Sequence, residues 1–398
     1  MSYRPHTTCR ICGSTNLIPV FDLGLQPLAN NFVKPCEPRQ GHYPLKVLFC
    51  TKCTLSQLSV VVDPQILYRD YKYVTSVSQT MREHFGRLIA MFKEEKAFEK
   101  GVLEIGSNDG AFLRELSPCT VYPVIGIDPA ENLAASNCIL GMFNRETAWK
   151  ALEIFAGYPS LIIARHCVAH MDDLKGFVDA LTVVGGPNTL IAIEIPYMRD
   201  TLNRVEFDQV YHEHLNFISL HSLEHLLHGS PFHIDRVIHY ALHGGTVLIL
   251  LRHGGSQIEP TISEYVREDK TTLEDWRVFS IKAENKIEEM LSAVCSRVGD
   301  SSVWGFGASA KASVWIQACG FTDREIYFVT DNSPLKPGCR MPGTDIPVVA
   351  QDELLKCQPD YCVLFCWNFR QEVLESQELW RSRGGKFIIP TSTGVEIV

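Results

Sequence analysis

Two pairs of cysteines near the N-terminus have the spacing of metal ligands. Cys9 and Cys12 form one C-x-x-C pair, and Cys50 and Cys53 form a second pair 37 residues further on. Each pair fits a tight turn that directs two thiolates to one point, and two such turns complete a tetrahedral zinc site. Because four thiolates leave no open coordination position, we expect a structural zinc ion. Buried cysteines without a ligand and a redox-active C-x-x-C pair are the alternatives.

A glycine-rich segment flanked by acidic residues has the features of a cofactor loop. The segment Gly106-Ser-Asn-Asp-Gly110 follows a short apolar run that contains Glu104, and Asp128 lies eighteen residues beyond it. Glycines let the backbone approach a ligand, and an acidic residue after the next strand accepts hydrogen bonds from ribose hydroxyls. Glu104 suits a cationic ligand better than a pyrophosphate, which favours S-adenosylmethionine. A dinucleotide and a purely structural turn are the alternatives.

The segment Tyr211-His212-Glu213-His214 places a phenol, two imidazoles and a carboxylate in four consecutive residues. Its H-E-H spacing differs from the H-E-x-x-H pattern of zinc proteases, so a metal site does not fit. A histidine can accept a proton near neutral pH, and a neighbouring carboxylate can orient it. We therefore interpret the segment as an acid–base site, with polar residues at a helix end as the alternative.

A second, weaker glycine loop lies at Gly305-Phe-Gly307-Ala308, with Lys311 three residues later. Lys311 and backbone N–H groups at the start of a helix could bind a phosphate. A tight packing turn with a solvated lysine is the alternative. The sequence thus contains two candidate nucleotide-type sites.

Alternating apolar and amphipathic segments predict the elements that position these residues. We expect a doubly wound parallel α/β sheet closed by an antiparallel hairpin, a long helix, and then a second α/β unit. The expected strands of the first sheet are 102–105, 121–127, 161–164 and 189–195, its helices 111–116 and 173–184, and its hairpin strands 234–239 and 246–251. The long helix is expected at 273–298, and later strands at 303–308, 326–329 and 361–366.

The composition excludes several classes of protein. The chain has 398 residues, 45% of them hydrophobic and 21% charged, which is ordinary for a globular protein and excludes a disordered one. Its net charge of −9 argues against a general nucleic-acid binder. No apolar run reaches the roughly 18 residues of a membrane span, and the N-terminus lacks an apolar signal core. We therefore expect a cytoplasmic protein that binds neither nucleic acid nor membranes.

Several segments together resemble the sugar C-methyltransferases, which act on nucleotide-linked 4-keto-6-deoxyhexoses in deoxysugar biosynthesis. The likeness runs from Cys9 to about Pro347 and includes the cysteine pairs and both glycine loops. The other matching segments are Asp22 to Asn30, Tyr43 to Leu45, Asp70 to Ser78, Glu206 to His214, His243 to Gly245, Asp331 to Asn332 and Lys336 to Pro347.

The resemblance implies an α/β protein of three parts. It predicts a small four-cysteine zinc domain at residues 1–75 and a class I methyltransferase core with a doubly wound sheet at 76–258. A C-terminal Rossmann-like domain at 259–398 would help to hold the nucleotide-sugar. We also expect a monomer or a weak homodimer.

The resemblance also implies methylation of a ring carbon, C3, of a dTDP-linked 4-keto-6-deoxyhexose. His214 is expected to remove the proton α to the C4 carbonyl, with Glu213 supporting it, while Tyr211 and Tyr73 hydrogen-bond the sugar oxygens. The residues expected at the cofactor are Glu104, Gly106, Asn108, Gly110, Asp128, Arg165 and His166. Those expected at the substrate are Tyr71, Ser76, Glu194, His243, Gly244, Lys311, Asn332, Lys336 and Arg340.

Two departures from the family pattern leave the identity of the sugar open. These are the extra histidine at His212 and the pair Arg165-His166. An O- or N-methyltransferase, which needs no α-proton removal, is the nearer alternative function. A non-catalytic scaffold that keeps the methyltransferase fold is the more distant one.

Overall fold

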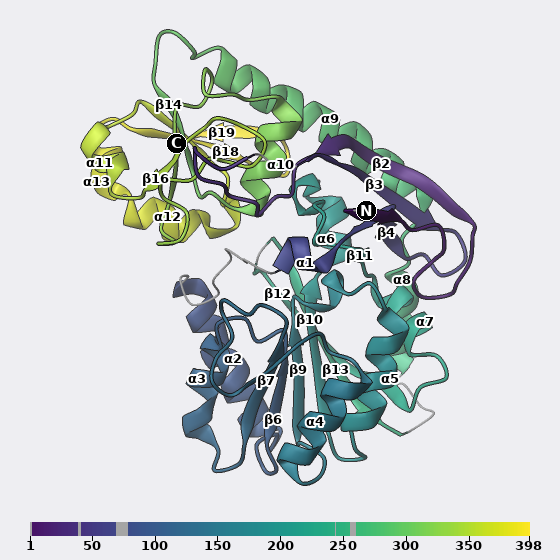
Figure 1. The fold of residues 1–398 in the computed structure, drawn as a ribbon. Helices are drawn as coiled ribbons and strands as arrows, with labels where there is room; N and C mark the ends of the chain where they lie inside the picture. Colours follow the sequence, from purple (N-terminus) through teal and green to yellow (C-terminus); the bar gives the residue numbers. More distant parts are fainter. Residues whose placement is uncertain (1, 39–40, 69–78, 243, 255–259) are drawn as a thin grey trace.

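Four β-sheets organise the chain in this computed structural model, which describes residues 2–38, 41–68, 79–242, 244–254 and 260–398 (Figure 1). We call residues 2–68 the N-terminal lobe, 79–254 the central unit and 296–398 the C-terminal unit. The central and C-terminal units each contain one large sheet. Helices α8 (Pro260–Glu268) and α9 (Leu273–Cys295) connect them.

The central unit is built on a seven-stranded sheet of order β12-β13-β10-β9-β6-β7-β8, in which β13 runs antiparallel to both neighbours. Helices α2 and α3 cover one face, and α4, α5 and α7 cover the other. Burial on both faces explains the almost uninterrupted apolar runs of the parallel strands. The strands are β6 (Val102–Ile105), β7 (Val124–Asp128), β8 (Cys138–Leu140), β9 (Leu161–Arg165), β10 (Leu190–Pro196), β12 (Phe232–Tyr240) and β13 (Thr246–His253). The helices are α2 (Gln79–Glu94), α3 (Ala111–Leu116), α4 (Arg145–Phe155), α5 (Leu174–Val184), α6 (Met198–Asn203) and α7 (Leu220–Leu227).

The C-terminal unit has a six-stranded sheet of order β16-β15-β14-β17-β18-β19, parallel except for the edge strand β19. Both large sheets therefore reverse strand order beside their first strand, which confirms the predicted doubly wound class. The strands are β14 (Val303–Phe306), β15 (Val329–Asp331), β16 (Val348–Ala350), β17 (Tyr361–Leu364), β18 (Lys386–Pro390) and β19 (Val395–Ile397). The helices are α10 (Ala310–Cys319), α11 (Glu353–Cys357), α12 (Arg370–Ser376) and α13 (Glu378–Ser382).

A glycine faces a cysteine at each point where the strand order reverses. A Cβ atom on Gly106, which has φ +72°, would lie 2.6 Å from Cβ of Cys167. A Cβ atom on Gly307, which has φ +85°, would lie 2.6 Å from Sγ of Cys366. Neither position accommodates a side chain, so both loops require glycine.

The N-terminal lobe is completed by a strand from the central unit. Its main sheet has the order β11-β4-β3-β2, and β11 (Asn216–Phe217) follows the predicted acid–base residues directly. The pairing is antiparallel, with Asn216 opposite Gln57. The lobe's own elements are β1 (Tyr3–Pro5), β2 (Leu17–Gln26), β3 (Tyr43–Cys50), β4 (Ser56–Leu58), β5 (Val60–Val62) and α1 (Pro64–Tyr68).

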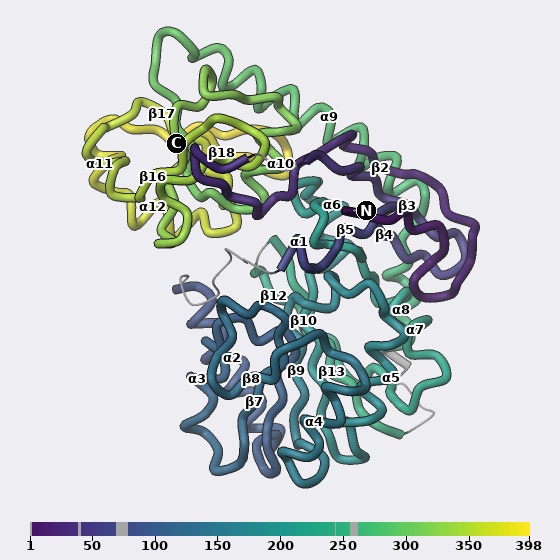
Figure 2. Tube along the Cα trace, in the orientation of Figure 1, coloured from purple at the N-terminus to yellow at the C-terminus, as the bar shows by residue number. Residues whose placement is uncertain are grey.

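Helix α9 packs between the N-terminal lobe and the C-terminal unit (Figure 2). A capping box between Thr272 and Asp275 begins it. Its buried side chains recur at intervals of three or four residues, as one face of a helix requires. Among them, the Trp276 indole N–H donates to Oγ of Ser56 at 2.8 Å. The helix thus holds two parts of the chain together.

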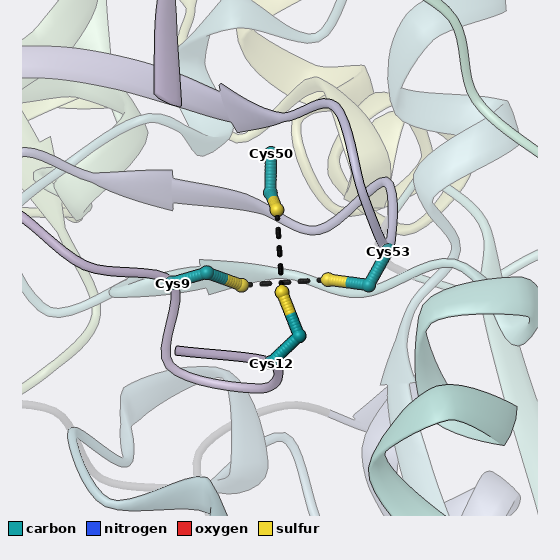
Figure 3. A group of neighbouring side chains, drawn as sticks. All are labelled: Cys9, Cys12, Cys50 and Cys53. Atoms are coloured by element: carbon teal, nitrogen blue, oxygen red, sulfur yellow. Dashed lines mark hydrogen bonds between the residues drawn. The ribbon is translucent and has the colours of Figure 1, made fainter. Parts of the chain in front are cut away.

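The four predicted zinc ligands meet at one point (Figure 3). Their sulfur atoms all lie within 4.8 Å of one another, and the closest pairs are Cys9 with Cys53 at 3.4 Å and Cys12 with Cys50 at 3.5 Å. A tetrahedral ion with Zn–S bonds of about 2.3 Å needs sulfur–sulfur separations of about 3.8 Å. The geometry therefore fits a zinc ion held by four thiolates.

Several element boundaries differ from the sequence predictions by a few residues, and the largest differences are three. The strand expected at 121–127 begins at Val124, because Val121 and Tyr122 lie in an exposed bend. The strand expected at 326–329 is confined to Val329–Asp331, and the long helix ends at Cys295 rather than 298. Among the described helices, none combines the length and the apolar character needed to span a bilayer.

Replacing Cys50 with serine should release the metal and destabilise the N-terminal lobe. The free energy of zinc binding contributes to folding at closed four-thiolate sites, so loss of one ligand weakens both. We expect metal analysis to show far less than one zinc ion per chain, and the thermal midpoint to fall by on the order of 5 °C. Cys36→Ser is the matched control, because Cys36 is exposed and lies outside the cluster. Full zinc content in Cys50→Ser would contradict the assignment.

Candidate active site

The predicted cofactor and acid–base residues lie around the carboxyl edge of the seven-stranded sheet. Strands β6, β7, β9 and β10 end there, beside the reversal of strand order between β6 and β9. Ligands of open α/β sheets bind at this edge. The predicted residues Tyr71, Tyr73, Ser76 and His243 lie outside the described residues.

The loop after β6 is shaped by residues with positive φ. Gly110 has φ +70° at the start of α3, and a Cβ atom there would lie 2.8 Å from Cβ of Ala135. Asn108 has φ +50°, and its backbone N–H donates to Oδ2 of Asp128 at 2.8 Å. The loop is therefore tied to the end of β7, where its backbone is close to any ligand.

Asp128 retains capacity to accept hydrogen bonds from a ligand. Its Oδ2 accepts from Asn108, and its Oδ1 accepts from the Ala130 N–H at 2.8 Å. Each carboxylate oxygen has two lone pairs, so each can accept one more donor. Burial raises the pKa of Asp128, while the two backbone N–H groups oppose that rise. The group fits the predicted contact with ribose hydroxyls.

Glu104 forms a buried ion pair with Arg165 from β9. Nε of Arg165 lies 3.1 Å from Oε1 of Glu104, and its guanidinium carbon lies 4.4 Å and 4.5 Å from the ring centres of Phe85 and Phe112. Burial raises the pKa of Glu104 to about 7, although Arg165 opposes the rise. Among the described residues, Oε2 of Glu104 has no hydrogen-bond partner. That oxygen can accept a hydrogen bond from a cationic ligand. Arg165 binds the other oxygen of Glu104 and so contacts the cofactor site only indirectly.

Glu194, at the end of β10, is shared by two histidines. Its Oε2 lies 2.6 Å from Nε2 of His84, and its Oε1 lies 3.0 Å from Nε2 of His166. The carboxyl is fully buried, which favours its neutral form, but the hydrogen bonds from His166 and His84 outweigh burial and lower its pKa. Glu194 thus joins α2 to the ends of β9 and β10.

The predicted base, His214, is held in one tautomer. Its Nδ1 lies 2.7 Å from the Gln209 carbonyl oxygen, which can only accept, so Nδ1 carries the proton. Its Nε2 lies 2.6 Å from Oη of Tyr211, which donates its hydroxyl hydrogen to the free lone pair. Burial, reinforced by the nearby His170, holds the pKa of His214 well below its usual 6.5. His214 is therefore a neutral imidazole with a basic Nε2.

Two side chains without a predicted role also belong to the site. The His170 ring lies 5.1 Å from that of His214 and stacks with that of Tyr68 at 6.4 Å. Burial, together with the charges of Glu213 and Asp128, raises the pKa of Tyr68. Tyr68 thus lies between the cofactor loop and the acid–base segment. Its sequence signal was its position just before the matching segment that begins at Asp70, and His170 had no such signal.

The other two acid–base residues face the N-terminal lobe. Glu213 accepts a hydrogen bond at Oε1 from the side chain of Asn30 at 2.9 Å, and burial raises its pKa. His212 is 1% exposed and packs edge-on against Tyr43, and burial lowers its pKa to about 4. His212 therefore contacts the lobe, whereas His214 faces Tyr211 and His170.

Lys311 and Gly244 lie beside two buried carboxylates that precede the acid–base segment. Nζ of Lys311 lies 3.9 Å from Oδ1 of Asp208 and 4.3 Å from the ring centre of Trp367. Burial raises the pKa of Glu206 to about 7, and Lys311 opposes the rise. A Cβ atom on Gly244 would lie 2.3 Å from Oε1 of Glu206, so the carboxylate packs directly on the glycine backbone. Lys311 is thus brought close to the site.

The remaining predicted substrate residues are placed on the C-terminal unit. Nζ of Lys336 donates to the Ala308 carbonyl at 2.7 Å and pairs with Asp331 at 3.2 Å. Arg340 pairs with Asp345 at 3.0 Å, and Asn332 is exposed. Among the described residues, no hydrogen bond or ion pair joins these three to Glu213 or His214. Lys336 and Arg340 also contact the N-terminal lobe, at the ring of Phe32 and the carbonyl oxygen of Val33.

Three family models match the chain in succession. Residues 9–68 match a model described as "Putative zinc binding domain", residues 78–237 match "Methyltransferase domain", and residues 241–391 match "C-methyltransferase C-terminal domain". The first match contains the four clustered cysteines, and the second contains the glycine loop and the acid–base segment.

Among characterised proteins, the chain is similar to the C-methyltransferase NovU of Streptomyces niveus. The two are 30% identical over 403 residues, which span 97% of this chain and 96% of NovU. Among solved structures, a SAM-dependent methyltransferase from Archaeoglobus fulgidus is 17% identical, with a TM-score of 0.32, over 48% of this chain and 87% of its own. The magnesium protoporphyrin IX methyltransferase ChlM of Synechocystis PCC 6803 is 13% identical, with a TM-score of 0.31, over 46% and 86%.

The likeness to NovU extends over nearly the full length of both chains, and the three family models together cover the lobe and both units. The four-thiolate cluster fits zinc, and the loop with Glu104 and Asp128 fits a cationic nucleoside cofactor. The chain therefore belongs to the S-adenosylmethionine-dependent C-methyltransferases that carry an N-terminal zinc-binding domain.

Proposed function

We propose that the protein methylates C3 of a nucleotide-linked 4-keto-6-deoxyhexose, through removal of the proton α to the ketone. The observation that carries this proposal is the fixed tautomer of His214, whose Nδ1 proton is engaged by Gln209 and whose Nε2 faces a phenol. The substrate class comes from the resemblance in the sequence. A carbon beside a ketone needs a base to become a nucleophile, and the site contains a neutral one.

The cofactor is proposed to bind at the loop after β6. S-adenosylmethionine supplies an electrophilic methyl group on its sulfonium. Asp128 would accept hydrogen bonds from the ribose hydroxyls, and Oε2 of Glu104 would accept a hydrogen bond from the amino group. Gly106 and Gly110 permit the close approach of the backbone.

Tyr211 and His214 are proposed to exchange partners when substrate binds. In the structure, the Tyr211 hydroxyl donates to Nε2 of His214. A sugar ketone in reach of Tyr211 would take that hydrogen bond, which exposes Nε2 to the α-proton. The phenol then stabilises the negative charge that develops on the ketone oxygen. Glu213, held by Asn30, would support the protonated imidazole.

The nucleotide is proposed to bind on the C-terminal side, at residues 259–398, with dTDP as its identity. Lys311 supports this proposal, because it lies 3.9 Å from Asp208, three residues before the acid–base segment, and its charge lowers the pKa of both Glu206 and His214. Its Nζ has no hydrogen-bond partner among the described residues, so it can bind a phosphate oxygen. Residues 1–75 and 76–258 would form the zinc and methyl-transfer domains of a monomer or weak homodimer.

Replacing His214 with asparagine should stop exchange of the α-proton and leave cofactor binding intact. The amide of asparagine cannot accept the proton, and the loop after β6 is unaltered. The measurement is the incorporation of solvent deuterium at C3 of a 4-keto-6-deoxysugar nucleotide, alongside calorimetry with S-adenosylmethionine. His225→Asn is the control, because His225 is exposed on α7. Undiminished exchange in His214→Asn would refute the base assignment, and methylation without exchange in the wild type would indicate an O- or N-methyltransferase.

The exchange reaction should tolerate mild acid. Because the pKa of His214 is held well below 6.5, the imidazole stays neutral through that pH, and exchange should decline only at lower pH. A decline with its midpoint at or above pH 6.5 would contradict the neutral base. Stability must be followed in parallel. The folded pKa values of His170 and His212 are about 4, so the unfolded chain binds more protons below about pH 6.5 and the free energy of unfolding falls there.

Lys311→Ala should raise the KM of the nucleotide-sugar with little change in kcat. A lysine that binds phosphate contributes equally to the ground state and the transition state, so its loss weakens binding alone, by about tenfold. Steady-state kinetics with the nucleotide-sugar varied would measure this. Lys282→Ala, at an exposed position on α9, should behave as the wild type. An equal loss in kcat and kcat/KM would instead place Lys311 at the chemical step.

A further inference from the structure

Asp208 joins the turn before the acid–base segment to two tryptophans of the C-terminal unit. It lies in the short 3-10 turn η4 (Phe207–Gln209) and is 1% exposed. Its Oδ2 accepts the indole N–H of Trp315 at 3.0 Å and that of Trp367 at 2.6 Å. Trp315 lies on α10, and Trp367 begins the turn η5 (Trp367–Phe369). One carboxylate oxygen therefore binds two distant segments.

The charges of Lys311 and Lys286 both act on this buried carboxylate. Nζ of Lys311 lies 3.9 Å from Oδ1, and it also lies over the ring of Trp367. A buried carboxylate is costly unless hydrogen bonds compensate it, and here the two indole N–H groups donate to it. The position of Asp208 is thus determined by the C-terminal unit.

The next residue, Gln209, supplies the carbonyl that binds Nδ1 of His214. The turn that contains Asp208 and Gln209 is short and has its own hydrogen bonds. The Gln209 N–H donates to the Glu206 carbonyl at 3.0 Å, and the Val210 N–H donates to the Phe207 carbonyl at 3.0 Å. A displacement of the Asp208 carboxylate therefore reorients the Gln209 carbonyl. That carbonyl determines which nitrogen of His214 carries the proton.

We propose that Asp208 is a positioning residue for methyl transfer, which uses the indole N–H groups of Trp315 and Trp367 to hold the Gln209 carbonyl against His214. The inference rests on the proposed function, in which His214 is the base. It assigns the C-terminal unit a part in the chemical step as well as in binding. Neither Asp208 nor the two tryptophans contact the reacting atoms.

The test weakens the acceptor or removes one donor. In Asp208→Asn the charged carboxylate becomes a neutral amide, which has a single oxygen and accepts more weakly, and in Trp367→Phe a smaller aromatic ring remains and the indole N–H is lost. We expect kcat for methylation to fall about tenfold or more in both, with the KM of S-adenosylmethionine within about twofold. If the two substitutions act through the same hydrogen bond, between Asp208 and Trp367, the double variant is no slower than the slower of the two single variants.

Trp380→Phe is the matched control. Trp380 is a buried indole of the same unit, and its N–H donates to the Pro359 carbonyl at 3.1 Å, outside the Asp208 contacts. Its loss removes an equivalent hydrogen bond and some stability, but kcat at a temperature where the protein is folded should match the wild type. If Asp208→Asn fails to fold, Trp367→Phe carries the test, because Trp367 is only half-buried.

The tautomer of His214 gives a readout that loss of stability does not change. Nitrogen NMR of histidine-labelled protein, assigned with His214→Asn, should show a protonated Nδ1 in the wild type and a mixed tautomer in Asp208→Asn and Trp367→Phe. An unchanged tautomer with unchanged kcat in both folded variants would overturn the inference. So would an equal loss of kcat in Trp380→Phe.

The two proposals fail in different ways. If His214→Asn still exchanges the α-proton, the proposed function fails, while the NMR comparison still decides whether Asp208 holds His214. If exchange depends on His214 but the Asp208 and Trp367 variants keep the wild-type tautomer and kcat, only the present inference fails.

Discussion

The hydrogen bond from Nδ1 of His214 to the Gln209 carbonyl is the contact on which the rest of the site depends. It leaves Nε2 as the basic atom, and it exists only while the segment 206–217 keeps its path. Three parts of the chain hold that path. The N-terminal lobe pairs with β11, the C-terminal unit binds Asp208, and the central sheet carries the cofactor loop next to it.

Buried carboxylates around this segment have partner side chains. Glu104 is paired with Arg165, and Glu194 with His84 and His166, so each carboxylate is already oriented before a ligand arrives. Burial also holds the pKa of His214 well below its usual value and so favours the neutral imidazole. Little reorganisation of the protein is then needed as charge moves between base and substrate.

Local patterns in the sequence were sufficient to predict the zinc ligands and both glycine loops. They also predicted the strand that begins at Val102 and the helix that begins at Ala111. Each of these has a spacing that physical chemistry restricts. Tyr68, His170 and Asn30 have no such spacing, because they reach the site through packing between distant segments. Asp208 lay within a matching segment, yet its role depends on tryptophans more than a hundred residues away. The sequence prediction placed the start of β7 too early, at residue 121, because Val121 and Tyr122 are apolar but exposed.

The pairing of β11 with β4 has a consequence for synthesis of the chain on the ribosome. The cysteine turns and strands β2 to β4 are all contained in residues 9–58, so they can assemble early. Strand β4 nevertheless remains unpaired on the side that β11 later occupies until residue 217 has left the exit tunnel. Nascent chains with an open edge are prone to misassociate. Zinc, which needs only the first 53 residues, would keep the emerging lobe compact during that interval.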